Sequence, residues 1–292
     1  MQTNKKITKA ILPVAGFGTR FLPATKAAPK EMLPIIDKPV IQYLVEEAVA
    51  SGITDIIFVT GRGKRAIEDH FDVSYELEDT LVEKNKQDLL EIVQKISGLA
   101  NFSYVRQPKP MGDGHAILCA RHLVGEDEAV AVLFGDDIVD GEVPAIKQLM
   151  DVYDKYHDPV IALNQVPMED VHRFGVVDAI EVSNRTFEIK RFVEKPKTED
   201  APSNLIAVGK YIITPEVFKK LEESRNDEGE IRLANAFVKM LENNMPLYGY
   251  EFEGERHDCG DKFGFVRATI KLGLKHPEIG EKLKDFLKDL KI

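Results

Sequence analysis

Apolar runs rich in β-branched residues alternate with amphipathic segments along the first half of the chain. The runs predict buried strands, and the segments with apolar residues three and four apart predict helices. The strands expected in this half are Lys9–Val14, Asp55–Thr60, Phe102–Arg106 and Ala129–Phe134. The helices expected between them are Val40–Ala50, Lys64–His70, Thr80–Ile96 and His115–His122. Strands and helices that alternate at this spacing predict a parallel sheet with right-handed crossovers.

After Pro144 the pattern changes to shorter strands with fewer helices between them. The strands expected here are Val160–Val166, Gly175–Ile180, Thr186–Glu194, Ile206–Ile213 and Leu247–Glu253. The helices expected are Ala145–His157, Pro215–Glu222 and Ile231–Leu241. This half is expected to extend the first sheet and to add antiparallel strands over its mouth. The predicted fold class is therefore α/β, with a Rossmann-like, mixed and mostly parallel sheet flanked by helices.

The last segment of the chain carries an apolar stripe at helical spacing, formed by Leu283, Phe286, Leu287 and Leu290. Such a stripe predicts an amphipathic helix. We expect the helix to dock on the protein's own core, and a contact with another subunit is the alternative.

Composition and charge limit the kinds of partner that the protein is expected to bind. A net charge of −10 over 292 residues argues against non-specific binding to nucleic acid or to anionic membranes. No apolar stretch approaches the roughly 20 residues that cross a bilayer, and the polar start Met1–Lys6 has no signal-peptide core. The two cysteines, Cys119 and Cys259, have no metal-ligand spacing and fit a reducing compartment. We therefore expect a cytoplasmic protein without nucleic-acid or membrane partners.

A glycine-containing loop after the first predicted strand is the strongest chemical signal. Gly16 and Gly18 allow a sharp turn and a close approach of backbone amides to phosphate oxygens. Arg20 adds a planar fork of donors, and Lys30 adds a point charge. A dinucleotide-binding fingerprint would need a third glycine where Phe21 stands, and a P-loop would need Gly-Lys-Ser or Gly-Lys-Thr, which the chain lacks. The pattern indicates a triphosphate site of another kind.

A pair of carboxylates, Asp136 and Asp137, follows the predicted strand that ends at Phe134. Ligands of parallel sheets lie outside the carboxyl ends of the strands, which places this pair at the ligand edge. Carboxylate oxygens suit Mg²⁺. Neighbouring residues of a strand point to opposite faces, so we expect only one of the two to face the ligand.

With these residues in place, the chain resembles the nucleotide-sugar pyrophosphorylases, and most closely the bacterial UTP–glucose-1-phosphate uridylyltransferases. The blocks that carry the resemblance appear in family order from about Lys9 to about His276. They are 13–20 (PVAGFGTR), 26–34 (KAAPKEMLP), 37–39 (DKP), 114–116 (GHA), 174–177 (FGVV), 193–197 (VEKPK), 201–205 (APSNL) and 257–260 (HDCG).

The resemblance implies direct transfer of a uridylyl group from UTP to glucose 1-phosphate, with release of pyrophosphate. It implies Mg²⁺ as the cofactor and a homodimer or homotetramer as the assembly. It also implies a single nucleotidyltransferase domain over residues 1–292, with a nucleotide-binding half (1–140), a sugar-binding half (141–260) and C-terminal helices (261–292).

The resemblance assigns site residues position by position. Its catalytic cations are Arg20, Lys30 and Lys195. Its nucleotide-binding residues are Ala15, Gly16, Gly18 and Thr19 in the loop, with Gln107 and Gly112 at the base. Its sugar-binding residues are Gly175, Glu194, Lys195 and Val208, and its metal ligands are Asp136 and Asp258. The carboxamide of Gln107 offers the donor and acceptor that match the imide edge of uracil.

Three alternative functions and several departures from the family pattern stay open at this point. Thymine presents the same edge as uracil, and sterics against one methyl group are worth only about 1–3 kcal/mol, so dTTP is an alternative nucleotide. Another hexose 1-phosphate is an alternative acceptor, and a non-catalytic sensor of nucleotide sugars is an alternative from another class. Asp113 and the segment 230–235 depart from the family pattern, which bears on substrate preference or subunit packing, and Asp137 has no assigned role.

Overall fold

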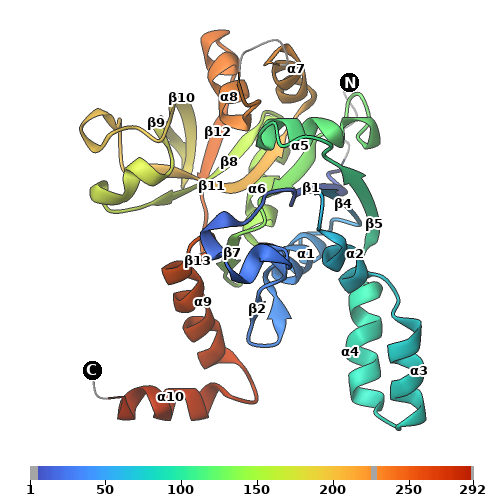
Figure 1. Ribbon diagram of the computed structural model, residues 1–292. Coiled ribbons are helices and arrows are strands. Elements are labelled where there is room, and N and C mark those ends of the chain that lie inside the picture. The colour runs from blue at the N-terminus through green and yellow to red at the C-terminus, as the bar shows by residue number, and fades with distance from the viewer. Residues whose placement is uncertain (1–5, 225–228, 291–292) are drawn as a thin grey trace.

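A computed structural model describes residues 6–224 and 229–290; the first five residues of the polar start considered above lie outside this range. In the described part, nine strands form one large twisted sheet that runs through the molecule (Figure 1). They are β1 (Lys9–Pro13), β4 (Asp55–Thr60), β5 (Asn101–Arg106), β6 (Val130–Leu133), β8 (Val160–Gln165), β9 (Gly175–Ser183), β10 (Thr186–Glu194), β11 (Leu205–Ile213) and β12 (Tyr248–Glu251).

The sheet is mixed, as expected, but a mostly parallel arrangement is not confirmed, because four of the eight neighbouring pairs among the described strands are antiparallel. The strand order is β5-β4-β1-β6-β11-β8-β12-β10-β9. Pairings among β5, β4, β1 and β6 are parallel, as the strand–helix alternation predicts. Beyond β6, only β8 and β12 pair in parallel, and the other neighbours are antiparallel. The reason is that β11 inserts between β6 and β8 and runs opposite to both, while β9 and β10 form a hairpin.

The chain order reverses at β1. From β1 the chain moves outward to β4 and β5, and then returns to place β6 on the other side of β1. The loops that leave the carboxyl ends of β1 and β6 therefore diverge and leave a crevice between them. Residues 14–30 and 134–136 meet in this crevice, so the order of the strands creates a place for a ligand.

Helices cover both faces of the sheet because its strands are apolar on both faces. In β1, Ala10 and Leu12 belong to one core cluster, whereas Ile11 belongs to the other. The helices on the first face are α1 (Val40–Ala50), α2 (Arg65–Phe71) and α6 (Ala145–Tyr156). The helices on the second face are α5 (Asp113–Cys119), α7 (Pro215–Glu223) and α8 (Leu233–Glu242). The predicted bounds of β4, β10 and α1 are confirmed without change.

The single helix predicted over Thr80–Ile96 is wrong. Two antiparallel helices, α3 (Tyr75–Glu83) and α4 (Gln87–Ser97), form a hairpin that projects from the body of the molecule (Figure 1). The turn between them places Asn85 at a φ of 53°, a left-handed conformation that asparagine tolerates better than most residues. Leu81 and Leu90 are buried, while the outer faces of the hairpin are exposed.

The C-terminal helices are α9 (Lys262–Lys275) and α10 (Gly280–Asp289), which extend away from the sheet (Figure 1). The expectation that the last apolar stripe docks on the protein's own core is wrong. Leu283 packs against α9 beside Gly273, but the side chains of Phe286 and Leu290 are exposed. None of the helices in residues 6–224 and 229–290 is long and apolar enough to cross a membrane.

Short elements that the hydrophobic pattern does not predict complete the fold. Strands β7 (Asp137–Asp140) and β13 (Glu255–Asp258) form a two-stranded antiparallel sheet, as do β2 (Pro34–Ile35) and β3 (Lys38–Pro39). The short 3₁₀ helices are η1 (Thr19–Phe21), η2 (Ala24–Lys26), η3 (Lys30–Met32), η4 (Arg121–Leu123), η5 (Met168–Arg173) and η6 (Thr198–Asp200). In the β7–β13 pair, Asp258 lies opposite Asp137, which brings the HDCG block to the carboxyl end of β6.

A buried ion pair ties the centre of the sheet to the helices on its first face. The Nζ of Lys210, on β11, lies 2.7 Å from Oε2 of Glu47, on α1, and both side chains are buried. Oε1 of Glu47 accepts a hydrogen bond from the backbone N–H of Ile146 in the first turn of α6. One carboxylate therefore satisfies a buried cation and a helix start at once.

Lys210→Ala should lower the free energy of unfolding by about 3–5 kcal/mol, because it leaves the Glu47 carboxylate buried without its cation. The measurement is urea unfolding followed by circular dichroism. Lys147→Ala is the control, since Lys147 pairs with Asp151 on the exposed face of α6 and such pairs are worth at most about 1 kcal/mol. Equal losses in the two variants would contradict the account of the buried pair.

Candidate active site

The loop that follows β1 folds back on itself at Gly18. This glycine has a φ of 65°, and a Cβ there would lie 3.0 Å from Cβ of Lys30 and 3.3 Å from Cγ2 of Thr25. The hydroxyl of Thr25 donates to the Gly18 carbonyl oxygen at 2.7 Å and fixes the turn. Glycine is therefore needed here both for the left-handed backbone and for the close approach of Lys30.

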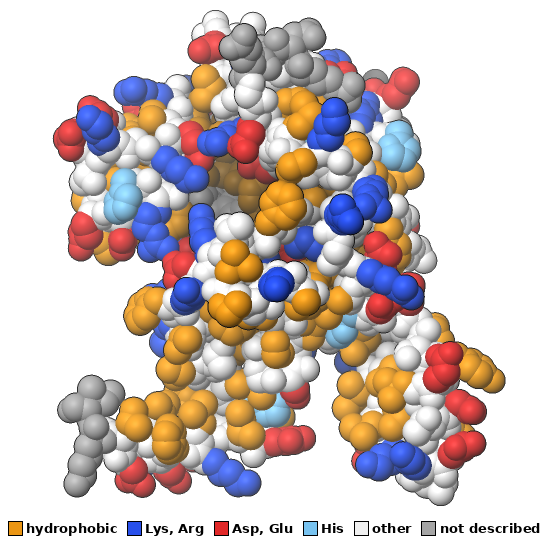
Figure 2. Space-filling model, in the orientation of Figure 1, with side chains coloured by type: hydrophobic (Ala, Val, Ile, Leu, Met, Phe, Trp, Pro, Cys, Tyr) orange, Lys and Arg blue, Asp and Glu red, His pale blue; other side chains and the backbone are white. Residues whose placement is uncertain are grey.

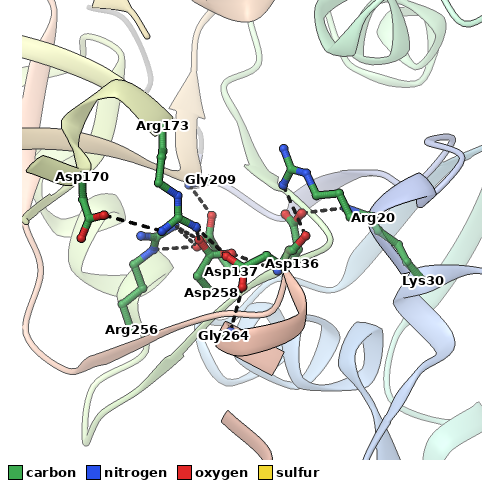
Figure 3. Close-up of polar contacts among 12 residues, drawn as sticks. Arg20, Lys30, Asp136, Asp137, Asp170, Arg173, Gly209, Arg256, Asp258 and Gly264 are labelled. Atoms are coloured by element: carbon green, nitrogen blue, oxygen red, sulfur yellow. Dashed lines mark hydrogen bonds and ion pairs between the residues drawn. The ribbon is translucent and has the colours of Figure 1, made fainter. Parts of the chain in front are cut away.

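Lys30 and Asp136 join the loop to the carboxyl end of β6. The Nζ of Lys30 lies 2.6 Å from Oδ2 of Asp136, and the two side chains face each other across the crevice (Figure 3). Burial alone would raise the pKa of the Asp136 carboxyl, but the ammonium of Lys30, assisted by the guanidinium of Arg20, holds that pKa below its ordinary value. The carboxylate is thus ionised at neutral pH and available to a cation.

A cavity of about 330 Å³ opens beside this pair. Figure 2 shows the surface hollowed between the two halves of the molecule, with charged side chains around the hollow. Of the residues predicted to bind nucleotide, Ala15, Gly16, Gln107 and Gly112 line the cavity, and so do Lys30 and Asp136. These predicted residues therefore share one open cavity at the crevice where the strand order reverses.

Gln107, another lining residue of this cavity, directly follows the carboxyl end of β5. Its carboxamide nitrogen lies 2.9 Å from the Gly112 carbonyl oxygen and 3.0 Å from Nδ1 of His115. Gly112 has a φ of 102°, and a Cβ there would lie 2.4 Å from the Ile231 carbonyl oxygen. Only glycine fits this position, and the tight packing fixes the orientation of the Gln107 side chain.

A second cavity of about 150 Å³ lies on the other side of Phe134. Gly175, Glu194 and Lys195, all predicted to bind sugar, line it. Lys195 has a φ of 47°, which is uncommon for a residue with a side chain, and its backbone N–H donates to the Phe174 carbonyl oxygen at 3.0 Å. This irregular backbone explains how the adjacent Glu194 and Lys195 can both face one space, which a regular strand would forbid.

The two cavities share Asp113 and Phe134 as lining residues, so they adjoin. The neighbouring aspartates at the end of β6 are divided between them: Asp136 lines the first cavity and Asp137 lines the second. Oδ2 of Asp137 accepts the backbone N–H of Gly209 at 3.1 Å, and Oδ1 lies 2.6 Å from Nη2 of Arg256. Asp137 therefore holds β11 and β13 in place beside the second cavity.

Asp258 and Asp136 face the same small space beside Gly260. A Cβ on this glycine would lie 2.9 Å from Oδ2 of Asp136 and 3.0 Å from Oδ1 of Asp258. The backbone also links them, because the N–H of Cys259 donates to the Asp136 carbonyl oxygen at 2.7 Å. Burial, and then the negative charge of Asp137, raise the pKa of the Asp258 carboxyl. The carboxylates of Asp136 and Asp258 thus converge beside Gly260.

Three arginines for which the sequence reasoning assigned no site role line the second cavity: Arg173, Arg232 and Arg256. Arg256 is bound between Asp137 and Asp258, and Arg173 also lies near Oδ2 of Asp258 (Figure 3). Arg232 pairs instead with Glu230. For Arg173 and Arg256, the surroundings are alike. Both guanidinium groups lie about 5 Å from the ring of Phe174, at 5.0 and 5.3 Å. Their nearness to the FGVV and HDCG blocks was the available signal, since Arg173 precedes the first block and Arg256 precedes the second.

The other residues singled out in the sequence lie in the loop, in the core or at the start of a helix beside the cavities. Thr19 and Arg20 are exposed, and Nη1 of Arg20 donates to the Gly260 carbonyl oxygen at 3.3 Å, so the loop reaches the Asp258 segment. Val208 is buried in the core, and its neighbours Ala207 and Gly209 line the second cavity in its place. Asp113, whose role was open, accepts the backbone N–H of Leu233 at 2.8 Å and fixes the start of α8.

The sequence matches a family of known proteins over most of its length. The family model for nucleotidyl transferases matches residues 9–273. A UTP–glucose-1-phosphate uridylyltransferase from Staphylococcus haemolyticus is 55% identical over 287 residues, which are 98% of this chain and 99% of that protein. A protein of the same name from Bacillus subtilis is 52% identical over 287 residues, which are 98% of each chain.

The fold agrees with solved structures of related enzymes. A UTP-bound UDP-glucose pyrophosphorylase from Acinetobacter baumannii superposes with a TM-score of 0.90 at 40% identity and covers 98% of this chain and 100% of its own. Another UDP-glucose pyrophosphorylase, solved in complex with UDP-glucose, has a TM-score of 0.83 at 41% identity over 92% of this chain and 100% of its own. The resemblance read from the motifs is confirmed, and the chain belongs to the nucleotidyl transferase family, in the branch of the bacterial UTP–glucose-1-phosphate uridylyltransferases.

Proposed function

We propose that this chain transfers the uridylyl group of UTP to glucose 1-phosphate and so makes UDP-glucose and pyrophosphate. The observation that carries the proposal is the pair of adjoining cavities, one lined by the glycine loop and Gln107, the other by Glu194 and Lys195. Relatives that share more than half of this sequence bear the name of that activity.

The reaction is a direct displacement. An oxygen of the glucose 1-phosphate forms a bond to the α-phosphorus of UTP while the bond from that phosphorus to the pyrophosphate oxygen breaks. The attacking oxygen is already anionic at neutral pH, so no general base is required. Two polyanions must be held in line against their mutual repulsion, which makes positioning and charge neutralisation the work of the site.

Residues of the glycine loop and of β6 hold the triphosphate. The amides that follow Ala15 and Gly16 approach its oxygens, and Gly18 and Thr19 keep the loop in shape. Lys30 leaves Asp136 and binds phosphate oxygens of UTP, while Arg20 neutralises the departing pyrophosphate. At the other end, the Gln107 carboxamide nitrogen already donates to Gly112, so its carbonyl oxygen is the group that accepts the N3–H of uracil.

The second cavity holds the sugar. Glu194 accepts hydrogen bonds from sugar hydroxyls, and Lys195 binds the 1-phosphate and brings its oxygen towards the first cavity. The backbone near Gly175 and Val208 borders the sugar ring. Position 175 needs a glycine, because a Cβ there would lie 2.5 Å from Cζ of Phe192 and would close the space.

Mg²⁺ is the cofactor we propose, with Asp136 and Asp258 as its protein ligands. Their oxygens converge beside Gly260, and within residues 6–224 and 229–290 no three His, Cys, Asp or Glu side chains form a complete metal cage. Two carboxylates with room for phosphate oxygens and water is the set that Mg²⁺ accepts. When bound, the ion neutralises charge on the reacting phosphates.

We also propose a homodimer or homotetramer. Phe263, Val266 and Leu274 on α9, Phe286 on α10 and Leu290 just after it expose apolar side chains, which gather over these two helices in Figure 2. Faces of this kind are normally covered by another surface. A molar mass measured by light scattering that equals one chain would contradict the proposal.

Pyrophosphate release measured over a grid of nucleotides and hexose 1-phosphates tests the function. We expect the highest kcat/KM for UTP with glucose 1-phosphate. The closest competitor is dTTP, since one methyl group changes the binding energy by only about 1–3 kcal/mol. Higher turnover with dTTP would make the chain a thymidylyltransferase, a preference for another sugar phosphate would change the acceptor, and binding of UDP-glucose without any turnover would favour a sensor.

A further inference from the structure

We propose that Arg173 is a second ligand for the phosphate of glucose 1-phosphate and that it acts together with Lys195. The inference rests on the proposed function, and it assigns a substrate contact to a residue that the family motifs do not include. Four observations carry it: the place of Arg173 in the fold, its partners, its exposure and the balance of charge in the second cavity.

Arg173 and Lys195 are held next to each other by the backbone. Arg173 is the last residue of η5, and Phe174 follows it. The carbonyl oxygen of Phe174 accepts the backbone N–H of Lys195 at 3.0 Å. One hydrogen bond therefore ties Lys195 to the residue that follows Arg173. Both side chains line the cavity that also contains Glu194. A ligand that reaches Lys195 is therefore within the reach of an arginine side chain at 173.

The ion pairs that Arg173 makes in this structure can be replaced by contacts to a ligand. It lies 2.5 Å from Oδ2 of Asp261, 3.8 Å from Oδ2 of Asp258 and 4.0 Å from Oδ1 of Asp170, and its side chain is 43% exposed (Figure 3). Ion pairs at such exposure contribute little free energy, so a stronger anion can displace them. The other carboxylate oxygen of Asp261 already accepts the N–H of Gly264 at the start of α9.

Arg256 differs from Arg173 in each of these respects. Its side chain is only 11% exposed, and it makes two contacts with Oδ1 of Asp137, at 2.7 Å from Nε and 2.6 Å from Nη2. Removing it would leave Asp137 buried without a cation, which is costly. We infer that Arg256 is part of the framework of the cavity. Arg232, the third arginine of the lining, is as exposed as Arg173 and pairs with Glu230 at 2.9 Å. Arg173 is the one we assign to the phosphate, because the next residue, Phe174, is hydrogen-bonded to Lys195.

The charges in the cavity call for a further cation. The Nζ of Lys195 lies 3.8 Å from Oε1 of Glu194, so part of its charge is offset before any ligand arrives. The charge of Arg256 is offset by Asp137, and that of Arg232 by Glu230. Arg173 also has a partner, Asp261, but that pair is exposed and can give way to a phosphate. A sugar phosphate carries close to two negative charges at neutral pH, and the planar fork of Arg173 matches two of its oxygens at once.

Titration calorimetry with glucose 1-phosphate, with glucose and with UTP tests this assignment in the wild-type protein and in Arg173→Ala, Arg173→Lys and Arg191→Ala. Arg191 is an exposed arginine of β10 outside the cavity lining and is the matched control. We expect Arg173→Ala to weaken glucose 1-phosphate binding by about 10- to 100-fold, the usual effect of losing a charged hydrogen bond, with unchanged binding of UTP and of glucose. Arg173→Lys should recover part of the loss, and Arg191→Ala should match the wild type.

Steady-state kinetics give the second readout. We expect Arg173→Ala to raise the KM for glucose 1-phosphate and to leave the KM for UTP and the Mg²⁺ dependence as in the wild type. Wild-type affinity for glucose 1-phosphate in Arg173→Ala would overturn the inference and leave the proposed function intact. Equal losses for UTP, Mg²⁺ and glucose 1-phosphate would also overturn it, because they would mean that Arg173 only supports Asp258. A wild-type protein that makes no UDP-glucose would instead refute the proposed function.

Discussion

Asp136→Asn should reduce kcat by about 10³-fold or more and leave the protein folded. Asparagine has the same shape but lacks the charge that Lys30 faces at 2.6 Å, and it is a poor ligand for a hard divalent ion. If the ion and its carboxylates contribute several kcal/mol to the transition state, each 1.4 kcal/mol lost is a factor of ten in rate. The measurement is the rate of UDP-glucose formation at saturating substrates and Mg²⁺.

Asp140→Asn is the matched control for this variant. Asp140 ends β7, three residues after Asp137, and its carboxylate pairs with Lys275 on the surface of α9 rather than facing either cavity. We expect it to keep wild-type kcat. Near-normal turnover in Asp136→Asn, or a comparable loss in Asp140→Asn, would refute the role given to Asp136.

Asp136→Asn should also alter the dependence of stability on pH. The folded-state pKa of this carboxyl lies below its ordinary value, so its ionised form stabilises the fold at neutral pH. That contribution is lost as the pH falls through the folded-state pKa. The difference in stability between wild type and variant should therefore shrink in acid, below the ordinary aspartate range.

Lys195→Ala should lower kcat/KM for glucose 1-phosphate by about 10²- to 10³-fold. The ammonium binds the phosphate that supplies the attacking oxygen, and removal of a charged donor at a reacting centre has effects of this size. Alanine keeps the Cβ, so the left-handed backbone at a φ of 47° carries the same strain in both proteins. The loss therefore reports on the ammonium group and not on the turn.

Lys190→Ala provides the comparison for Lys195→Ala. Lys190 lies on the same strand, β10, where its Nζ pairs with Glu188 and stays outside the cavity. Its replacement should leave both substrates' KM values unchanged. Loss of UTP affinity in Lys195→Ala without loss of glucose 1-phosphate affinity would contradict the assignment of Lys195 to the sugar phosphate.

Local patterns were sufficient for most of the sheet and helices. The β4 sequence Asp55–Thr60 is apolar on both faces, and α1 has a continuous apolar side, so both were predicted with the correct bounds. The β7 and β13 strands are four residues each and carry charged residues, so no hydrophobic pattern marks them. The sheet was predicted to be mixed, but its share of parallel pairings was overestimated, because alternation of strand and helix does not say which strands become neighbours.

The residues of the candidate site also divide into those that the sequence pointed to and those that only the fold brings together. The glycine loop indicated a phosphate site by its own chemistry, whereas the roles of Asp136, Glu194 and Lys195 came from the resemblance to the family and stay predictions. The role of Asp137 was not, because it depends on Arg256, which is 119 residues away in the chain. Arg173 was missed for a similar reason, since only the folded chain places it beside Lys195 and Asp258.

A crystal structure of the protein with UDP-glucose and Mn²⁺, read by anomalous scattering, tests the central claim most directly. The account predicts Mn²⁺ bound between Asp136 and Asp258, uracil against Gln107, and glucose against Glu194, with the two phosphates spanning the boundary at Phe134. A metal peak away from these two carboxylates, or a nucleotide bound outside the cavity at the β1 loop, would contradict it.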